Sequence, residues 1–139
     1  MNISDTIIKY REEIDYHLSK IYSNGPISLT EPINYVLSGG GKRLRSLLTI
    51  LTTEACGGVK EDVFNSALAV EVLHNFTLVH DDIMDQDSIR HGQDTVHEKW
   101  DDGIAILTGD AMLSLALRLI NQSQSASKQM QIFIDGLLA

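Results

Sequence analysis

Hydrophobic residues recur along this chain with the three- and four-residue spacing of an α-helix, while the alternation typical of strands is scarce. The first such stripe consists of Ile7, Ile8, Ile14, Leu18 and Ile21. Ser4 or Asp5 is the predicted N-cap, because short polar side chains accept hydrogen bonds from the first turn. The pattern predicts an amphipathic helix near the N-terminus, ended by the turn-forming stretch SNGPIS at 23–28.

Two more helices are predicted before residue 57. A short one follows Thr30, with Pro32 in its first turn, where a missing N–H does no harm. Three glycines at 39–41 break this helix. The next helix runs from about Lys42 to Cys56 and stops at the glycine pair 57–58.

The segment from Glu61 to about Asp85 is the longest and most apolar of the chain. Its apolar side chains nearly encircle a helix, and they are Val63, Phe64, Leu68, Val70, Val72, Leu73, Phe76, Leu78 and Val79. A helix that is apolar on most sides is buried by its neighbours. We therefore expect this helix at the centre of the fold.

The rest of the chain continues the helical pattern. Polar residues at Ser88–Thr95 predict a loop, and a further helix begins near Asp101 or Asp102 and continues to Ile120. A polar linker at 122–127 precedes one more amphipathic helix at 128–139. The sequence therefore predicts one all-α domain, residues 1–139, with about six helices.

Composition excludes several classes of function. The 139 residues carry 11 Lys and Arg against 19 Asp and Glu, a formal charge of −8, which argues against a general nucleic-acid-binding protein. No uninterrupted apolar run approaches the roughly 18 residues of a membrane span, and the N-terminus lacks the features of a signal peptide. The single cysteine, Cys56, fits a reducing compartment. We therefore expect a cytoplasmic protein without a membrane span.

The motif HDDIMD at 80–85 ends the long apolar helix. Asp81 and Asp85 are separated by four residues, and Asp82 and Asp85 by three, so their carboxylates are neighbours on a helix. They repel one another, and the negative end of the helix dipole adds to the cost. A cation would compensate, and Mg²⁺ prefers oxygen ligands. The alternative is that the aspartates are simply solvated where the helix leaves the core.

The motif GGGKRLR at 39–45 gathers three of the eleven basic residues within four positions. Glycines expose backbone N–H groups, and Lys42 and Arg45 are separated by three residues, so the segment predicts an anion-binding loop. It is not a phosphate-binding P-loop, because Arg43 replaces the required Ser or Thr. The alternative is a flexible loop beside a solvated basic patch.

Three further residues accompany these motifs. His74 lies seven residues before Asp81 and thus on the same helix face, either as a ligand-binding residue or as a hydrogen-bonded core residue. Arg90 and His91 follow the aspartates and are candidates to close over an anion, or else ordinary surface residues. A metal-dependent phosphohydrolase is a further possibility from the His80-Asp81 pair, but other elements supply no clear additional ligands.

In combination, the motifs at 39–45 and 74–85, Arg90, and TGD at 108–110 resemble the N-terminal half of trans-isoprenyl diphosphate synthases, the polyprenyl synthetase family, closest in type to the geranylgeranyl diphosphate synthases. The resemblance extends from about Asn34 to the end of the chain. It implies the all-α isoprenoid synthase fold around a central cavity. It also implies a prenyltransferase that condenses isopentenyl diphosphate with an allylic diphosphate to a geranylgeranyl- or farnesyl-type product.

The resemblance also implies residue roles. Asp81, Asp82 and Asp85 would hold Mg²⁺ against the allylic diphosphate, and Arg90 would contact that diphosphate. The residues Lys42, Arg45 and His74 would bind isopentenyl diphosphate. Phe76 and Thr77 would form the cavity floor that limits product length, and the alternative is that Phe76 is simply a core residue.

Two positions depart from the family's pattern. His91 stands where a second arginine is usual, which implies a weaker or pH-dependent grip on isopentenyl diphosphate. Ser46 stands where proline is usual, and we expect this difference to matter little.

Members of this family are about twice as long as this chain and contain a second aspartate-rich motif that the sequence lacks. The apolar end IFIDGLLA, without a cap, is typical of a helix interior. We therefore expect an incomplete half of a synthase, which pairs as a homodimer or with a second half. The alternative is a non-catalytic diphosphate-binding or regulatory subunit that pairs with a full-length synthase.

Overall fold

Seven helices and one short hairpin make up residues 2–139, the part of the chain that the computed structural model describes. The elements are α1 (Ile3–Leu18), α2 (Ile27–Ser38), α3 (Leu44–Ala55), α4 (Lys60–Met84), β1 (Ile89–Arg90), β2 (Gln93–Asp94), α5 (Val96–Lys99), α6 (Asp102–Asn121) and α7 (Ala126–Leu138). This confirms the all-α fold predicted from the sequence.

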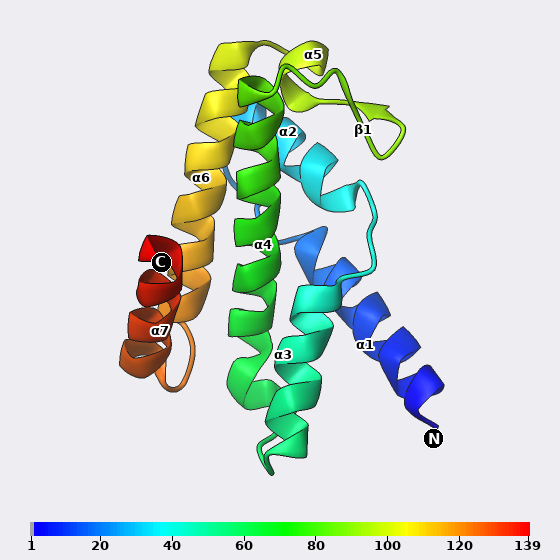
Figure 1. The fold of residues 1–139 in the computed structure, drawn as a ribbon, viewed down its shortest axis with the longest axis vertical. Coiled ribbons are helices and arrows are strands. Elements are labelled where there is room, and N and C mark those ends of the chain that lie inside the picture. Colours follow the sequence, from blue (N-terminus) through cyan, green and yellow to red (C-terminus); the bar gives the residue numbers. More distant parts are fainter. Residues whose placement is uncertain (1) are drawn as a thin grey trace.

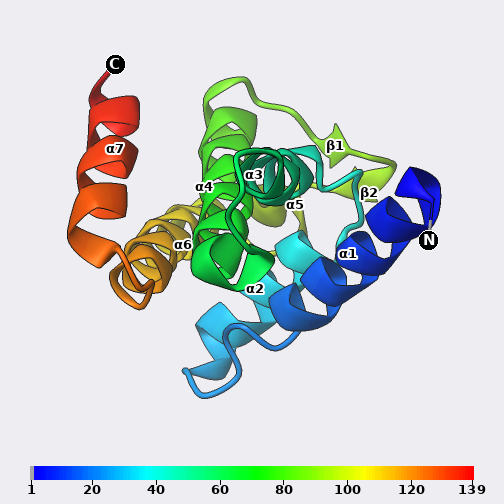
Figure 2. The ribbon, with the colours of Figure 1, turned by 90° about the horizontal axis from the view of Figure 1, so that it is seen from below.

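Helix α4 is the central helix, as its apolar residues predict. It stands between α3, which packs along its N-terminal half, and α6, which packs along most of its length (Figure 1). Ala67, Ala69 and Val72 are completely buried, and the small alanines let neighbouring helices approach closely. In the view from below, helices α1 and α2 lie along one side of α4 and α6, and α7 lies at the outer edge beside α6 (Figure 2).

Helix α6 is the second core helix. It is long and apolar enough, by length and composition alone, to cross a membrane, a property that the sequence analysis does not anticipate. In the structure Ala105, Met112 and Ala116 are completely buried, and the helix packs against α4 and α2. This packing explains its apolar composition as that of a core helix.

The structure corrects several predictions in the first half of the chain. The N-cap of α1 is Asn2, whose side chain accepts from Asp5 N, rather than Ser4 or Asp5. Ile8 is 56% exposed and does not belong to the buried stripe. Helix α2 begins before Thr30, so Pro32 lies inside it, and α3 begins two residues after Lys42.

The predicted loop at 88–95 contains regular structure. Strands β1 and β2 pair antiparallel, with Ile89 opposite Asp94 and Arg90 opposite Gln93. The two residues between them, His91 and Gly92, have φ of 51° and 77°, the positive values that a type I′ hairpin turn requires. The short helix α5 follows directly and was also not predicted.

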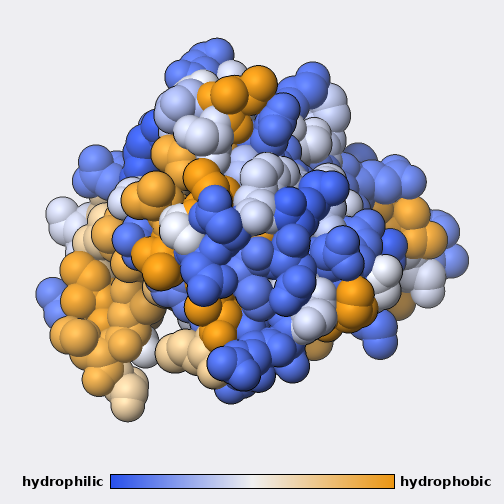
Figure 3. Space-filling view, turned by 90° about the horizontal axis from the view of Figure 1, so that it is seen from above, coloured by the Kyte–Doolittle hydropathy of each residue, from blue (hydrophilic) through white to orange (hydrophobic). Residues whose placement is uncertain are grey.

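Helix α7 lies at the edge of the fold beside α6 (Figures 1 and 2), and its Gln129 hydrogen-bonds Ser66 and Asp62 of α4. Only Phe133 of this helix is buried, while Ile132 and Leu138 are 65% and 82% exposed. Apolar side chains consequently gather over α7 at one edge of the space-filling view, and polar ones dominate the rest of that face (Figure 3).

Candidate functional site

A cavity of about 220 Å³ lies between the α2–α3 loop, the second half of α4 and the β1–β2 hairpin. It brings together most of the polar residues that the sequence analysis selected, and these are Lys42, Arg45, His74, Asp82, Arg90 and His91. Asp81, Asp85, Phe76 and Thr77 are not among its lining residues. Residues separated by more than 40 positions therefore share one site.

The basic motif divides into an outer and an inner part. Gly40 and Gly41 have φ of 80° and 136°, values that favour glycine, and they turn the chain sharply between α2 and α3. Lys42 and Arg45 are exposed and line the cavity, whereas Arg43 between them is only 4% exposed. Lys42, Arg43 and Arg45 are all strongly basic, so the sequence alone did not distinguish the buried Arg43 from its two exposed neighbours.

Ser46, in the first turn of α3, is completely buried. Its backbone N–H faces Glu71 Oε2 at 3.4 Å, and its hydroxyl donates to the carbonyl of Ala67 at 2.6 Å. Proline has neither an N–H nor a hydroxyl, so these two contacts belong to the serine alone, and the expectation that the difference matters little stays a prediction.

His74 projects from α4 into the cavity and is partly buried. Burial, reinforced by the positive charge of Arg45, lowers the pKa of His74, and the carboxylate of Glu71 opposes this only in part. The neutral imidazole consequently dominates at neutral pH. An anion that enters the cavity would favour the protonated form.

The three aspartates of the HDDIMD motif differ in their surroundings. Asp82 is 4% exposed and turned into the fold, whereas Asp81 and Asp85 are exposed at the end of α4. Within residues 2–139, no three His, Cys, Asp or Glu side chains are arranged to hold a metal ion by themselves. Mg²⁺ typically takes one or two carboxylates and completes its shell with phosphate oxygens and water. The donor set at this helix end fits that mode of binding.

Arg90 of the hairpin is the partner of Asp82. Its Nε donates to Asp82 Oδ1 and Oδ2 at 2.8 and 3.0 Å, and its Nη2 donates to Oδ1 at 2.6 Å. These bonds raise the pKa of the Arg90 guanidinium above its ordinary value. The neighbouring His91 is exposed at the tip of the hairpin turn.

Phe76 and Thr77 lie on other sides of α4. Thr77 is exposed, and its hydroxyl donates to the carbonyl of His74 at 2.7 Å. Phe76 packs against the core and meets the ring of His80 edge-on, with the ring centroids 4.9 Å apart. A role for this pair in limiting product length stays a prediction.

Comparison with known proteins identifies close relatives. A family model described as polyprenyl synthetase matches residues 27–139. A geranylgeranyl diphosphate synthase of Saccharolobus solfataricus is 40% identical over 124 residues, which cover 86% of this chain and 37% of that protein. A short chain isoprenyl diphosphate synthase of Methanothermobacter thermautotrophicus is 34% identical over 98% of this chain and 43% of its own length.

Solved structures agree with the sequence comparisons. A crystal structure of a geranylgeranyl pyrophosphate synthase is 46% identical and superposes with a TM-score of 0.80 over 90% of this chain and 38% of that one. A geranylgeranyl pyrophosphate synthetase of Geoglobus acetivorans gives a TM-score of 0.80 at 38% identity, over 85% of this chain and 39% of that one. This chain therefore spans about two fifths of the length of these relatives.

Proposed function

Because this chain belongs to the polyprenyl synthetase family, we propose that it forms the diphosphate-binding part of a prenyltransferase of isoprenoid biosynthesis. The reaction joins isopentenyl diphosphate to an allylic diphosphate and gives a geranylgeranyl- or farnesyl-type product. One observation carries the proposal: the cavity gathers the basic residues of the glycine loop, His74 of α4 and the Asp82–Arg90 pair at its other side.

Isopentenyl diphosphate binds at the side of the cavity formed by Lys42, Arg45 and His74. Lys42 and Arg45 are exposed cations on the same short segment, and Arg45 offers a planar set of donors that matches phosphate oxygens. His74 accepts a proton when the diphosphate binds and then adds a third cation. His91 of the hairpin also lines this cavity. The side chains of this side are cationic, so no metal ion is needed there.

The allylic diphosphate binds at the end of α4. Asp81 and Asp85 are exposed carboxylates that would hold Mg²⁺, and Asp82 would join them when Arg90 turns to the diphosphate. When bound, Mg²⁺ neutralises charge on the diphosphate as its bond to the allylic carbon breaks. Arg90 stabilises the same developing charge by hydrogen bonds.

The apolar wall of the cavity protects the allylic cation that remains. Val36, Leu78 and Val79 line the cavity beside the polar groups and offer no nucleophile to the cation. The double bond of isopentenyl diphosphate then attacks the allylic carbon, and the departed diphosphate accepts the proton that is lost as the new double bond forms. Product length is limited by Phe76 and Thr77 in this proposal.

The assembled enzyme covers the exposed apolar side chains at the edge of the fold. Ile106 and Leu107 of α6 are 47% and 55% exposed, and α7 exposes Ile132, Leu137 and Leu138. A second copy of the chain, or a segment equivalent to the rest of the longer relatives, buries them in our proposal. The exposed thiol of Cys56 fits a cytoplasmic location.

Incubation of the chain with Mg²⁺, labelled isopentenyl diphosphate and allylic diphosphates of increasing length tests the proposal. Because the chain is an incomplete half in this proposal, we expect products longer than the primer by five-carbon units only when a second copy, or a segment equivalent to the rest of the longer relatives, completes the site. The substitution Asp81→Ala abolishes this elongation, whereas Glu12→Ala on the exposed face of α1 leaves it unchanged. A folded sample that gives no elongated product, whether the chain is monomeric or paired with a second copy, contradicts an enzymatic role for this chain.

A second candidate function is a non-catalytic diphosphate-binding or regulatory subunit. The observation in its favour is that the chain spans about two fifths of its relatives and, within residues 2–139, lacks a complete set of metal ligands. This function predicts that isopentenyl diphosphate binds without elongation. It also predicts that added chain changes the product distribution of a full-length synthase.

A further inference from the structure

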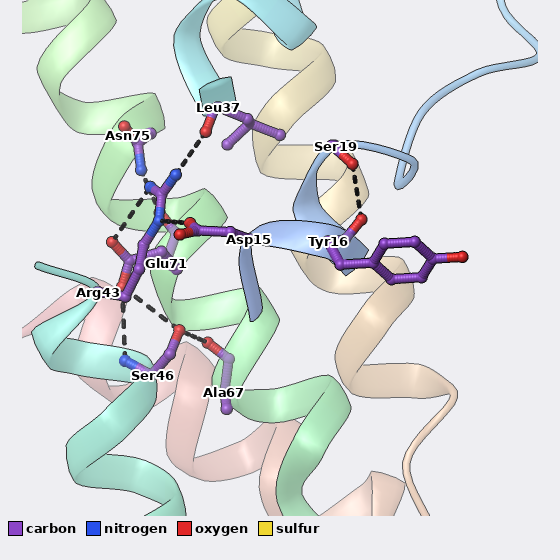
Figure 4. A network of polar contacts seen from close by, with 9 residues as sticks. All are labelled: Asp15, Tyr16, Ser19, Leu37, Arg43, Ser46, Ala67, Glu71 and Asn75. Atoms are coloured by element: carbon purple, nitrogen blue, oxygen red, sulfur yellow. Dashed lines mark hydrogen bonds and ion pairs between the residues drawn. The ribbon is translucent and has the colours of Figure 1, made fainter. Parts of the chain in front are cut away.

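A network of polar contacts, buried except at the partly exposed Asp15, lies beneath the glycine loop and joins α1, α2, α3 and α4 (Figure 4). Arg43 is its centre. Its Nε donates to Asp15 Oδ1 of α1 at 2.7 Å, and its Nη2 donates to the carbonyl of Leu37 in α2 at 2.6 Å. Its Nη1 lies 3.9 Å from Glu71 Oε1 of α4. One guanidinium therefore ties the segment before α3 to three other helices.

Glu71 completes the network from the opposite side. Its side chain is 7% exposed, and its Oε2 faces the backbone N–H of Ser46 at 3.4 Å. This N–H belongs to the first turn of α3, where backbone donors lack intrahelical partners. The N-cap residue Arg43 makes no capping bond of its own. Glu71 thus supplies a cap for α3 from the neighbouring helix.

The backbone of Arg43 has an unusual conformation. Its φ of 50° and ψ of 35° lie in the left-handed region, which residues other than glycine seldom adopt and which persists only when surrounding contacts fix it. The contacts of its side chain provide that support. The left-handed residue sets the change of direction between the extended loop and α3.

Lys42 and Arg45 stand on either side of this change of direction. Both are exposed, and both line the cavity together with His74. Two neighbouring cations repel each other, so a mobile segment would let them separate. An anchored segment keeps them together before a ligand arrives, and binding then costs less conformational entropy.

We propose that Arg43 and Glu71 are positioning residues that hold Lys42 and Arg45 in the orientation that binds a diphosphate. This inference rests on the proposed function, because it concerns the same isopentenyl diphosphate site. Arg43 acts through its neighbours, since carboxylates and a carbonyl already occupy its guanidinium. Arginine is required there because a lysine ammonium cannot reach three separate partners at once.

A double-mutant cycle on isopentenyl diphosphate binding tests this role. Binding is measured by NMR titration in EDTA for the wild-type chain, Arg43→Lys, Arg45→Met and the double variant. We expect Arg43→Lys to weaken binding about tenfold in the wild-type background and much less in the Arg45→Met background, because residues that act as one unit are not additive. Arg11→Lys, on the exposed face of α1, is the matched control and leaves binding unchanged.

The outcomes separate this inference from the proposed function. Equal affinities of the wild-type chain and Arg43→Lys, or equal losses in both backgrounds, overturn the positioning role and leave the diphosphate site intact. A wild-type chain that does not bind isopentenyl diphosphate overturns the proposed function, and the positioning role with it. If Arg43→Lys does not fold, Glu71→Gln replaces it in the same cycle and is expected to act in the same direction.

Discussion

The carboxylate of Asp82 is held by the guanidinium of Arg90, with donor–acceptor distances between 2.6 and 3.0 Å. Asp82 lies in the last turn of the central helix, and Arg90 lies in the hairpin that follows this helix. This pair therefore fixes the hairpin over the end of α4. It also means that one of three neighbouring aspartates already has a cationic partner.

Replacement of Arg90 by methionine is expected to destabilise the fold. Asp82 would remain as a buried carboxylate without its partner, which costs on the order of 1–3 kcal/mol. Urea unfolding at neutral pH measures this change in the free energy of unfolding. The matched control is Arg118→Met on α6, whose side chain is exposed, and for which we expect a change close to zero. Equal stabilities of the two variants would show that the pair contributes nothing to the fold.

Mg²⁺ is expected to bind the chain weakly by itself and more tightly when inorganic pyrophosphate is present. Within residues 2–139 no three acidic or imidazole side chains converge, so phosphate oxygens have to complete the metal's shell. Calorimetric titration with and without pyrophosphate measures the difference. Asp81→Asn should remove the enhancement, and Asp135→Asn on α7 should preserve it. Tight binding of Mg²⁺ without pyrophosphate would contradict this expectation.

The pKa of His74 should respond to Arg45. Burial is the main cause of its lowered pKa, and the positive charge of Arg45 is the second. Substitution Arg45→Gln should therefore raise the pKa of His74 toward its ordinary value of about 6.5. NMR titration of the imidazole measures this change. A pKa that stays the same or falls in the variant would exclude an electrostatic contact between the two residues.

The same lowered pKa makes the stability of the fold depend on pH. Below about pH 6.5 the unfolded chain takes up a proton at His74 more readily than the folded chain does, so stability is lost as the pH falls through this window. Well above pH 7 both states are neutral at this position, and the contribution vanishes. Urea unfolding should show that His74→Gln loses less stability than the wild-type chain between pH 7.5 and pH 5.5. Parallel losses would assign the pH dependence to other groups.

Gly109 of α6 is required for the close approach of α6 to α4. A Cβ atom at this position would overlap the ring of His80, whose Nε2 donates a hydrogen bond to the carbonyl oxygen of Ile106 at 3.2 Å. We expect Gly109→Ala to cost about 1–3 kcal/mol, because the ring has to leave its contacts.

The double variant Gly109→Ala with His80→Ala tests the cause of this cost. Removal of the ring makes room for the new methyl group, so the double variant should lose less stability than the sum of the two single variants. Thermal unfolding of the four proteins measures this coupling. Simple additivity would show that the two residues do not compete for the same space.

The sequence by itself determined the helical elements that carry their own periodicity. The apolar surface of α4 required neighbours on most sides, and its bounds, Lys60–Met84, agree closely with the prediction. The glycines at 39–41 and 57–58 marked real interruptions. The motifs at 39–45 and 80–85 also pointed to the family, because their residues are adjacent in the sequence and can be recognised without knowledge of packing.

Only the tertiary structure decided which charged side chains face the cavity. Arg43 is buried and Arg45 is exposed because Asp15, 28 residues earlier, and Glu71, 28 residues later, surround one of them. The pair Asp82–Arg90 likewise depends on a hairpin whose left-handed turn begins with a histidine. Local patterns record which face of a helix is apolar, but the partner of a buried charge is set by how the helices pack together.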